Sequence, residues 1–354
     1  MKYPEIVEFA DVLQRRAEFD TIIDVRSEAE FAEDHIAGAI NCPVLDNQQR
    51  IVVGTMYKQT GSFEAKRLGA ALVARNIAQH IETRFLDRPR DWKPLIYCWR
   101  GGNRSGAMAH IFARIGWPVA QLNGGYKAYR QHVNHSLMNE IARFQWRVLC
   151  GPTGSGKSHL LRSLAAAGAQ VLDLEDMAAH RGSVLGSIPD CPQPAQKQFE
   201  SRIFWQLQQF HPQQLIFVEA ESKKIGDIRV PELLMDTIRK APCIAVQMTI
   251  EKRVDLLMQE YAHFILSPAS LNQQLDFLTS LYGKEKIAAW RQLATTGELA
   301  LLVKNLLEQH YDPAYAKSVR RNFAGAATAT VIQQHDITES DFTDSARQIL
   351  DNIA

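Results

Sequence analysis

The stretch Gly151-Pro152-Thr153-Gly154-Ser155-Gly156-Lys157-Ser158 decides how the middle of this chain folds. The apolar run RVLC (147–150) precedes it and the run HLLRSLAAAG (159–168) follows it, so it connects a predicted buried strand to a predicted helix. Its glycines allow successive backbone N–H groups to converge on an anion at the start of that helix. The pattern G-x-x-x-x-G-K-[ST] in this context predicts a phosphate-binding loop, or P-loop, for a di- or triphosphate.

Individual side chains around the P-loop have predicted roles. Lys157 is expected to pair with the terminal phosphate, and Ser158 is expected to hold a metal ion, for which Mg²⁺ is the candidate. An acid at the end of a nearby strand should complete the site. The candidates are Glu219, which ends LIFVE, and Asp173, which ends QVLD. Glu221 would face the same side of a continued strand as Glu219. The alternative for these acids is a capping or surface role.

The segment Ala179-His180-Arg181-Gly182-Ser183 is rich in groups that bind anions. His180 and Arg181 are therefore candidate substrate-binding residues. The alternative is an ordinary loop between helices.

Short apolar runs alternate with helical patterns along the first 250 residues. This alternation, with glycine-rich turns or polar helices after most runs, predicts a parallel α/β architecture. A connecting helix is predicted over 132–143, which places a domain boundary near residue 140. Long amphipathic patterns at 251–264 and 284–307 predict a helical C-terminal region. The predicted strands are 21–25, 94–98, 147–150, 170–174, 215–219 and 243–248.

A second candidate site lies in the run Tyr97-Cys98-Trp99-Arg100-Gly101-Gly102-Asn103-Arg104-Ser105, between a predicted strand and a predicted helix. A thiol at that junction faces the positive end of the helix dipole, which stabilises its thiolate. Arg100 and Arg104 add positive charge, and the two glycines between them let backbone amides close around an anion. The pattern predicts that Cys98 is a catalytic nucleophile, assisted by both arginines, for a group that carries an oxyanion. The alternative is a buried structural cysteine.

Other segments of the first 135 residues accompany this cysteine: Asp24-Val25-Arg26, Glu30-Phe31, His35-Ile36-Ala37-Gly38-Ala39-Ile40-Asn41 and Leu122-Asn123-Gly124-Gly125-Tyr126. Together they resemble the rhodanese family, in which Cys98 occupies the position of the persulfide cysteine. Common sulfurtransferase loops of that family place four residues between Cys and Arg, whereas Cys98 and Arg104 enclose five. Five is the spacing of rhodanese-fold phosphatases, whose wider loop holds a tetrahedral phosphate. We therefore expect this loop to accept a group larger than bare sulfur. Asp24, Arg26 and His35 are interpreted as scaffold.

The net charge hides an uneven distribution. The chain has 354 residues with 40 basic and 39 acidic side chains, a net charge of +1 that by itself argues against a nucleic-acid partner. Between Arg84 and Arg162, however, thirteen Lys and Arg stand against three acids, so this stretch carries +10 and the remainder −9. The alternative is a solvated surface, but both candidate anion sites fall inside the stretch, which favours a functional interpretation.

Composition excludes several other classes of protein. No apolar run reaches the roughly 18 residues of a membrane span, and the start MKYPEIVEF lacks the apolar core of a signal peptide. The five cysteines form no Cys-x-x-Cys pair. They predict a reducing, cytoplasmic location without structural zinc or a disulfide scaffold.

Further segments extend the pattern beyond both loops: Cys98-Trp99-Arg100-Gly101-Gly102, His180-Arg181-Gly182-Ser183, Glu219-Ala220-Glu221-Ser222 followed by Ile225-Gly226, and His310-Tyr311-Asp312-Pro313 with Tyr315. The whole chain is similar to the bacterial tRNA 2-selenouridine synthase family. The resemblance implies that sulfur of 2-thiouridine at the tRNA wobble position is replaced by selenium from selenophosphate. It also implies an S-geranyl-2-thiouridine intermediate made from geranyl diphosphate.

This resemblance assigns expected roles to the two sites. Cys98 would handle the selenium, and the P-loop would stabilise the pyrophosphate that departs during geranyl transfer. We expect tRNA and small-molecule phosphates as partners and no tightly bound cofactor. A modified wobble base must leave its stack, and Trp99, Tyr126 and Tyr129 are candidates for holding it, with core packing as the alternative. A second basic cluster, or a solvated helix face, consists of Lys317, Arg320 and Arg321.

The predicted fold class is α/β: a rhodanese domain at 8–135, a linker helix at 136–146, a P-loop NTPase-like parallel α/β domain at 147–250 and a helical C-terminal extension at 251–354. A rhodanese-fold phosphatase is the main alternative function, although it leaves the P-loop unexplained. A nucleotide-regulated binding module and a nucleotide kinase in the second domain are further alternatives. The P-loop ligand stays open between geranyl diphosphate, ATP and GTP.

Overall fold

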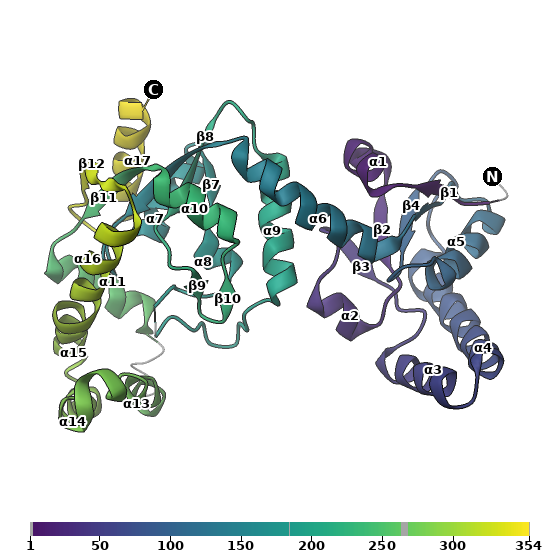
Figure 1. Ribbon diagram of the computed structural model, residues 1–354, viewed down its shortest axis with the longest axis horizontal. Helices are drawn as coiled ribbons and strands as arrows, with labels where there is room; N and C mark the ends of the chain where they lie inside the picture. Colours follow the sequence, from purple (N-terminus) through teal and green to yellow (C-terminus); the bar gives the residue numbers. More distant parts are fainter. Residues whose placement is uncertain (1–2, 184, 263–267, 354) are drawn as a thin grey trace. The chain divides into compact units, whose positions relative to one another are not determined.

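The computed structural model describes residues 3–183, 185–262 and 268–353 and divides into two compact units. The N-terminal unit consists of the described residues up to Leu137 together with Glu200–Trp205, and the C-terminal unit consists of the described remainder. Figure 1 colours the chain along its sequence from purple to yellow. The division falls inside helix α6 (Gly125–Ala142), close to the boundary that the sequence predicts near residue 140.

A five-stranded parallel sheet in the order β1-β5-β4-β2-β3 forms the centre of the N-terminal unit. The predicted strands at 21–25 and 94–98 are confirmed as β2 and β4, whose apolar side chains are almost fully buried. The other strands are only three residues long, too short for a periodic pattern to reveal them. The strands are β1 (Glu5–Val7), β2 (Thr21–Asp24), β3 (Ala39–Asn41), β4 (Pro94–Tyr97) and β5 (Ala120–Leu122).

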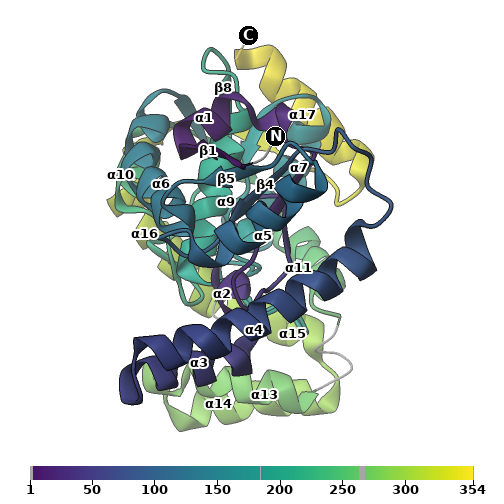
Figure 2. The ribbon, with the colours of Figure 1, turned by 90° about the vertical axis from the view of Figure 1, so that its right-hand side faces the viewer.

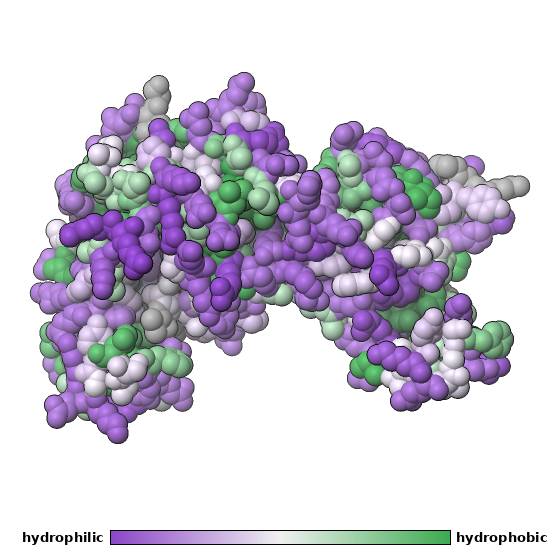
Figure 3. Space-filling view, in the orientation of Figure 1, coloured by the Kyte–Doolittle hydropathy of each residue, from purple (hydrophilic) through white to green (hydrophobic). Residues whose placement is uncertain are grey.

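Helices surround this sheet and include one long hairpin. Figures 1 and 2 show α3 and α4 side by side, and Gly69 of α4 lies against Val53 of α3. Figure 3 shows hydrophobic side chains at the surface in the region of this hairpin. Tyr57 and Phe63 are exposed residues of the hairpin. The helical segments are α1 (Phe9–Gln14), η1 (Arg16–Glu18), α2 (Glu28–Glu33), α3 (Asn47–Gln59), α4 (Ser62–His80), η2 (Ile81–Phe85), α5 (Asn103–Ile115) and α6.

A second parallel sheet, in the order β12-β11-β6-β8-β7, forms the centre of the C-terminal unit. The four strands predicted between residues 147 and 248 are all confirmed. The middle strand β6 leads directly into the P-loop. The loop therefore lies at the carboxyl end of a parallel strand, where ligands bind in open α/β sheets. The strands are β6 (Gln145–Cys150), β7 (Gln170–Leu172), β8 (Leu215–Glu219), β11 (Pro242–Gln247) and β12 (Gly325–Gln333), besides the antiparallel pair β9 (Lys224–Ile225) and β10 (Ile228–Arg229).

The C-terminal region is helical as predicted, with one difference. Strand β12 lies inside the region 251–354, which we expected to be helical. It pairs with β11, which precedes that region. Its sequence GAATATVIQ holds small side chains that are mostly exposed, so it lacks the apolar signal of a strand. The expected linker helix at 136–146 corresponds to the last part of the longer helix α6, which already ends at Ala142, and β6 begins at Gln145.

The predicted amphipathic patterns correspond to several helices. Gly297, with a φ of +82°, ends α14, so the pattern at 284–307 is divided between α14 and α15. Residues 263–264 of the pattern at 251–264 lie outside the described residues. Helix α9 (Gln196–Gln209) is divided, because its residues Glu200–Trp205 belong to the N-terminal unit. The other helical segments of the C-terminal unit are α7 (Lys157–Ala166), α8 (Leu174–Met177), α10 (Glu232–Lys240), α11 (Ile250–Glu260), α13 (Pro268–Asp276), α14 (Thr279–Thr296), α15 (Leu299–Leu306), η3 (Leu307–Tyr311), α16 (Asp312–Asn322) and α17 (Glu339–Ile353).

Each unit has its own apolar core. Ile96 and Phe112 belong to the core of the N-terminal sheet, Leu149 and Phe217 to that of the C-terminal sheet, and Trp290 to a third cluster among the C-terminal helices. Among the described helices, none is long and apolar enough to cross a membrane. All five cysteines are free thiols.

Candidate active sites

The cysteine loop connects β4 to α5 in the N-terminal unit. Cys98 follows the last residue of β4 and is itself buried, whereas Trp99 and Arg100 are exposed. Gly101 and Gly102 have φ angles of +66° and +73°, and a Cβ on Gly102 would lie 2.8 Å from Nε2 of Gln121. Glycine is therefore required where the loop turns into the helix.

The sulfur of Cys98 lies against the first turn of α5. The Ser105 hydroxyl donates a hydrogen bond to Sγ at 3.3 Å, and the thiol itself lies 3.6 Å from the Arg100 carbonyl oxygen, to which it can donate. The sulfur is thus placed at the N-terminus of α5, with the Ser105 hydroxyl as its hydrogen-bond donor. The geometry suits a nucleophile, as the sequence predicts, and it adds Ser105 as a partner that sequence reasoning did not single out.

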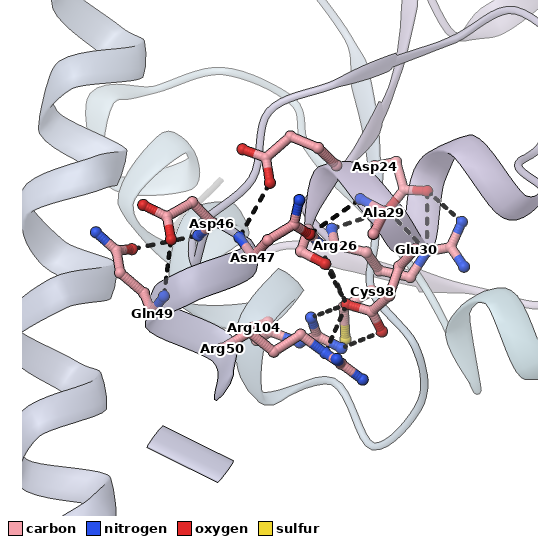
Figure 4. Close-up of polar contacts among 12 residues, drawn as sticks. Asp24, Arg26, Ala29, Glu30, Asp46, Asn47, Gln49, Arg50, Cys98 and Arg104 are labelled. Carbon is pink, nitrogen blue, oxygen red and sulfur yellow. Dashed lines mark hydrogen bonds and ion pairs between the residues drawn. The ribbon is translucent and has the colours of Figure 1, made fainter. Parts of the chain in front are cut away.

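The two loop arginines have different surroundings. Arg104 forms a two-pronged ion pair with Glu30 of α2, with N–O distances of 2.8 and 3.3 Å, beside Cys98 (Figure 4). Arg50 binds the same carboxylate at 3.0 Å. Although burial opposes ionisation of Glu30, the hydrogen bond and charge of Arg104 hold its pKa below the ordinary value. In this state Arg104 is therefore held by Glu30, and the exposed Arg100 is the arginine that faces solvent.

Asp24 and Arg26 form the scaffold that the sequence predicts. Both side chains are buried, and their ion pair measures 2.6 Å. Arg26 also donates to the carbonyl oxygen of Asp34 and lies 4.0 Å from the ring centroid of Tyr126. Nδ1 of His35 donates to the Phe31 carbonyl oxygen, 2.9 Å away, which agrees with a turn-fixing role.

The start of α6 closes the cysteine loop from behind. The backbone N–H groups of Tyr126 and Lys127 donate to the carbonyl oxygens of Cys98 and Trp99 at 2.7 and 2.9 Å. This approach is possible because Gly125 has no side chain: its φ is +56°, and a Cβ would lie 2.3 Å from the Cys98 carbonyl oxygen. The glycine therefore fixes the backbone that carries the nucleophile.

Gly125→Ala is expected to destabilise the protein and to disturb the cysteine loop. The matched control is Gly116→Ala, because Gly116 also has a positive φ, +117°, but open space around it. The control carries only the strain of a positive φ, roughly 1–2 kcal/mol. Gly125→Ala should lose at least about 1 kcal/mol more, because a backbone carbonyl must also move. Denaturant unfolding of both variants measures the difference, and equal losses would contradict this account.

The P-loop follows β6 as predicted and is shaped by its close contacts. A Cβ on Gly151 would lie 2.4 Å from Ser155 Oγ, and a Cβ on Gly156 would lie 2.5 Å from the ring of Phe342. Lys157 lies across the loop, and its Nζ donates to the Gly151 carbonyl oxygen at 2.8 Å. Ser155 Oγ is buried, and no hydrogen-bond partner for it exists among the described residues. An anion in the loop would supply that acceptor.

Acidic side chains gather beside Ser158, at the end of the loop. Ser158 donates to Glu175 of α8 at 3.0 Å, and Glu219 accepts a hydrogen bond from the Glu175 backbone N–H at 2.8 Å. Asp173 accepts from the N–H of Asp176 and so caps α8. Glu175, which sequence reasoning missed, is thus the acid in contact with Ser158. The signal was present in the DLED run, where it stands two residues after Asp173.

Burial makes these carboxyl groups reluctant to ionise. Burial, together with the charges of Asp173, Glu175 and Glu221, raises the pKa of Glu219 well above its ordinary value. Burial also raises the pKa of Glu221, to about 8, with Glu175 adding to the effect. The folded protein therefore holds protons at a pH where the unfolded chain has released them.

Glu219→Gln is expected to remove part of the resulting pH dependence. For a carboxyl group whose pKa is higher in the folded state, stability is complete below the ordinary pKa and is lost as the pH rises. The variant should match the wild type at pH 5 and exceed its free energy of unfolding at pH 9 by at least about 1.4 kcal/mol. Denaturant unfolding at both pH values measures this, with the exposed Asp236→Asn as control. Parallel pH profiles of wild type and variant would contradict it.

Residues 179–183 lie next to this acidic cluster. A Cβ on Gly182 would lie 2.4 Å from an oxygen of Glu175, and the N–H of Gly182 donates to Nδ1 of His180. His180 is buried, which lowers its pKa. The Arg181 guanidinium lies 4.9 Å from the ring centroid of Tyr261, and for its buried Nη1 no partner exists in the described part of the chain. Both predicted substrate-binding residues therefore reach the P-loop region.

An ion pair that the sequence did not suggest supports the P-loop from the other side. Arg253 of α11 is buried, donates twice to the carbonyl oxygen of Thr153, at 2.7 and 2.9 Å, and pairs with Asp312 at 2.6 Å. The hydroxyl of Tyr315 accepts a hydrogen bond from the N–H of Gly151. Asp312 of the HYDP segment thus supports the P-loop through Arg253, and Tyr315 contacts the loop directly.

These elements enclose one cavity of about 560 Å³ around the P-loop. Asp173, Glu175 and Glu221 line it, whereas Glu219 lies behind its wall. Most of the predicted site residues of this unit are among its lining residues, which include Thr153, Gly154, Ser155, Gly156, Lys157, Ser158, Arg162, Asp173, Glu175, His180, Arg181, Glu221, Tyr261, Tyr311 and Tyr315.

The three aromatic side chains that are candidates for base binding differ in their exposure to solvent. Tyr126 and Tyr129 are buried in the N-terminal unit, which agrees with the packing alternative. Trp99 is 36% exposed, and its ring stacks on Tyr126 with centroids 5.3 Å apart. Of the three candidate rings, Trp99 is therefore the one that is accessible from solvent. The second basic cluster, at residues 317, 320 and 321, is exposed on α16.

Comparison with known proteins agrees with this arrangement. Residues 144–277 match the family model of the tRNA 2-selenouridine synthase AAA domain, and residues 8–132 match that of the rhodanese-like domain. A tRNA 2-selenouridine synthase of Sulfurovum sp. is 36% identical over 68% of this chain and 65% of that protein. The enzyme of the same name from Nitrosomonas europaea is 31% identical over 91% of this chain and 81% of that protein.

A third relative, the tRNA 2-selenouridine synthase of Bdellovibrio bacteriovorus, is 30% identical over 85% of this chain and 89% of that protein. The similarity thus extends through both units and includes the cysteine loop and the P-loop. The chain belongs to the tRNA 2-selenouridine synthase family.

Proposed function

We propose that this protein is a tRNA 2-selenouridine synthase that replaces sulfur by selenium at the wobble uridine of tRNA. The observation that carries the proposal is the presence of two separate anion sites, the cysteine loop and the P-loop, in one chain of this family. The proposed reaction uses two phosphorylated co-substrates, geranyl diphosphate and selenophosphate. Two sites built for different phosphate groups suit such a sequence of steps.

The first step is assigned to the P-loop. The sulfur of 2-thiouridine attacks C1 of geranyl diphosphate, a C–S bond forms, and the C–O bond breaks with its electron pair passing to pyrophosphate. Lys157 and the N–H groups of the loop stabilise that leaving group. Arg181 and Arg162, which line the same cavity, can add positive charge. Mg²⁺ remains a proposal: no cluster of three metal-binding side chains exists among the described residues, so an ion would need phosphate oxygens besides Ser158 and Glu175.

The second step is assigned to the cysteine loop. The thiolate of Cys98 attacks the phosphorus of selenophosphate, an S–P bond forms, and hydrogen selenide leaves with the electron pair of the P–Se bond. Hydrogen selenide then adds to C2 of the geranylated base, and geranylthiolate departs. Water hydrolyses the S–P bond to phosphate and restores the thiol. The five-residue spacing between Cys98 and Arg104 supports this step, because it provides room for a tetrahedral phosphate.

Mass analysis of tRNA nucleosides tests the proposal in cells. Cells without this protein should contain 2-thiouridine derivatives and no 2-selenouridine at the wobble position, and the wild-type chain should restore the selenium. Unchanged 2-selenouridine in the deletion strain refutes the proposal.

The loop spacing also favours a second candidate, a rhodanese-fold phosphatase. Incubation with an aryl phosphate distinguishes the two functions. Rapid hydrolysis with repeated turnover that depends on Cys98 favours the phosphatase, whereas the synthase should leave the ester intact.

A further inference from the structure

An apolar cavity adjoins the P-loop cavity in the C-terminal unit. It has a volume of about 60 Å³, several times the roughly 10–15 Å³ that one water molecule needs. Its wall is almost entirely carbon and is formed mainly by α11, α15 and η3. The lining residues include Leu257, Met258, Leu271, Leu299, Leu302, Val303, Leu306 and Leu307.

Five residues line both cavities, which are therefore adjacent: Thr153, Ser183, Leu257, Tyr261 and Tyr311. Leu257 touches the P-loop itself, since a Cβ on Gly154 would lie 2.9 Å from its Cδ1. The hydroxyls of Ser183 and Tyr261 lie 3.4 Å apart where the two cavities adjoin. Leu257 therefore lines the apolar cavity and also contacts the backbone of the P-loop, so the apolar lining begins directly beside the phosphate-binding loop.

We infer that the apolar cavity receives the hydrocarbon chain of a diphosphate ester whose diphosphate occupies the P-loop. The inference rests on the proposed function and deepens it, because it selects among the ligands that the motif leaves open. A prenyl chain in this cavity would gain free energy with every apolar group removed from water. A nucleotide base would bury its polar edges against leucine side chains, which provide no hydrogen bonds.

The lining residue Val303 offers a test with a neighbour as control. Val303 is partly buried on α15 and faces the cavity, whereas Leu301 on the same helix is 46% exposed and is not a lining residue. Val303→Trp fills the cavity, and Val303→Thr changes its polarity at nearly constant volume. Leu301→Trp adds the same ring to the same helix outside the cavity.

Isothermal titration of the full chain with Mg²⁺ compares pyrophosphate, dimethylallyl diphosphate, geranyl diphosphate and ADP. Geranyl diphosphate should bind at least about tenfold more tightly than pyrophosphate, with dimethylallyl diphosphate between them. ADP should bind no more tightly than pyrophosphate. Equal affinity for pyrophosphate and geranyl diphosphate, or tightest binding of ADP, overturns the inference.

The variants of Val303 and Leu301 then test where the hydrocarbon chain of the ligand binds. Val303→Trp should weaken geranyl diphosphate at least about tenfold and Val303→Thr about threefold, while both keep pyrophosphate affinity within twofold. Leu301→Trp should change neither affinity. Equal weakening of both ligands in the Val303 variants, or no weakening of either, overturns the inference. A separate measurement tests the proposed function. If Lys157→Ala leaves pyrophosphate affinity unchanged, the P-loop is not the diphosphate site, wherever the hydrocarbon chain of the ligand binds.

Discussion

Cys98→Ala is expected to abolish selenium incorporation, with a loss of at least about 10³-fold, while geranylation of 2-thiouridine continues. Removal of a nucleophile eliminates the S–P intermediate, for which no neighbouring group can substitute. Ser105 is the nearest hydroxyl, but it is buried and already donates to the sulfur. The variant should therefore accumulate S-geranyl-2-thiouridine instead of the selenated base.

The measurement is mass analysis of tRNA nucleosides after incubation of tRNA with purified variant, geranyl diphosphate and selenophosphate. Cys42→Ala is the matched control, because Cys42 is a second buried cysteine of the same unit and lies outside the loop. A second readout is the intermediate itself: wild type quenched during turnover should carry phosphate on Cys98, and Cys98→Ala should carry none. Selenation by Cys98→Ala at a tenth or more of the wild-type rate contradicts the assigned role.

Local patterns were sufficient to predict much of the fold and the two backbone loops. The strands at 94–98 and 147–150 are short apolar runs followed by glycine-rich loops, so the apolar pattern and the turn chemistry agree. Strand β12 escaped prediction because its small side chains are mostly exposed. Its place in the sheet depends on pairing with β11, whose residues lie about 80 positions earlier in the sequence.

The side-chain partners of both loops depend on contacts between distant segments. Arg104 meets Glu30 across 74 positions, and Arg253 reaches Thr153 across 100. No local pattern encodes such a pair, since Arg104, Glu30 and Arg253 each resemble a surface charge when their partners are not known. Spacing in the sequence thus located the nucleophile and the phosphate cradle, while the residues that orient them became evident only in the folded chain.

Lys157→Ala is expected to have the opposite effect to Cys98→Ala: geranyl transfer should fall by at least about 10²-fold, while the cysteine loop stays intact. In the structure Nζ of Lys157 is bonded to the Gly151 carbonyl oxygen, inside the loop that would hold the leaving group. Loss of one positive group aimed at developing negative charge costs on the order of 3–4 kcal/mol in the transition state. Lys157→Met keeps most of the chain length without the charge and should lose as much.

Geranylation of 2-thiouridine tRNA by the purified variants measures the loss, with Lys252→Ala as control, since Lys252 lies in the same unit and pairs with Asp336 at 2.8 Å. Chemically geranylated tRNA offered with selenophosphate bypasses the first step. On that substrate Lys157→Ala should incorporate selenium at close to the wild-type rate, whereas Cys98→Ala should not. If the two steps belong to different loops, geranylated tRNA must restore selenium incorporation by Lys157→Ala but not by Cys98→Ala. Equal failure of both variants on 2-thiouridine tRNA and on geranylated tRNA would therefore contradict the division of the two steps between the two loops.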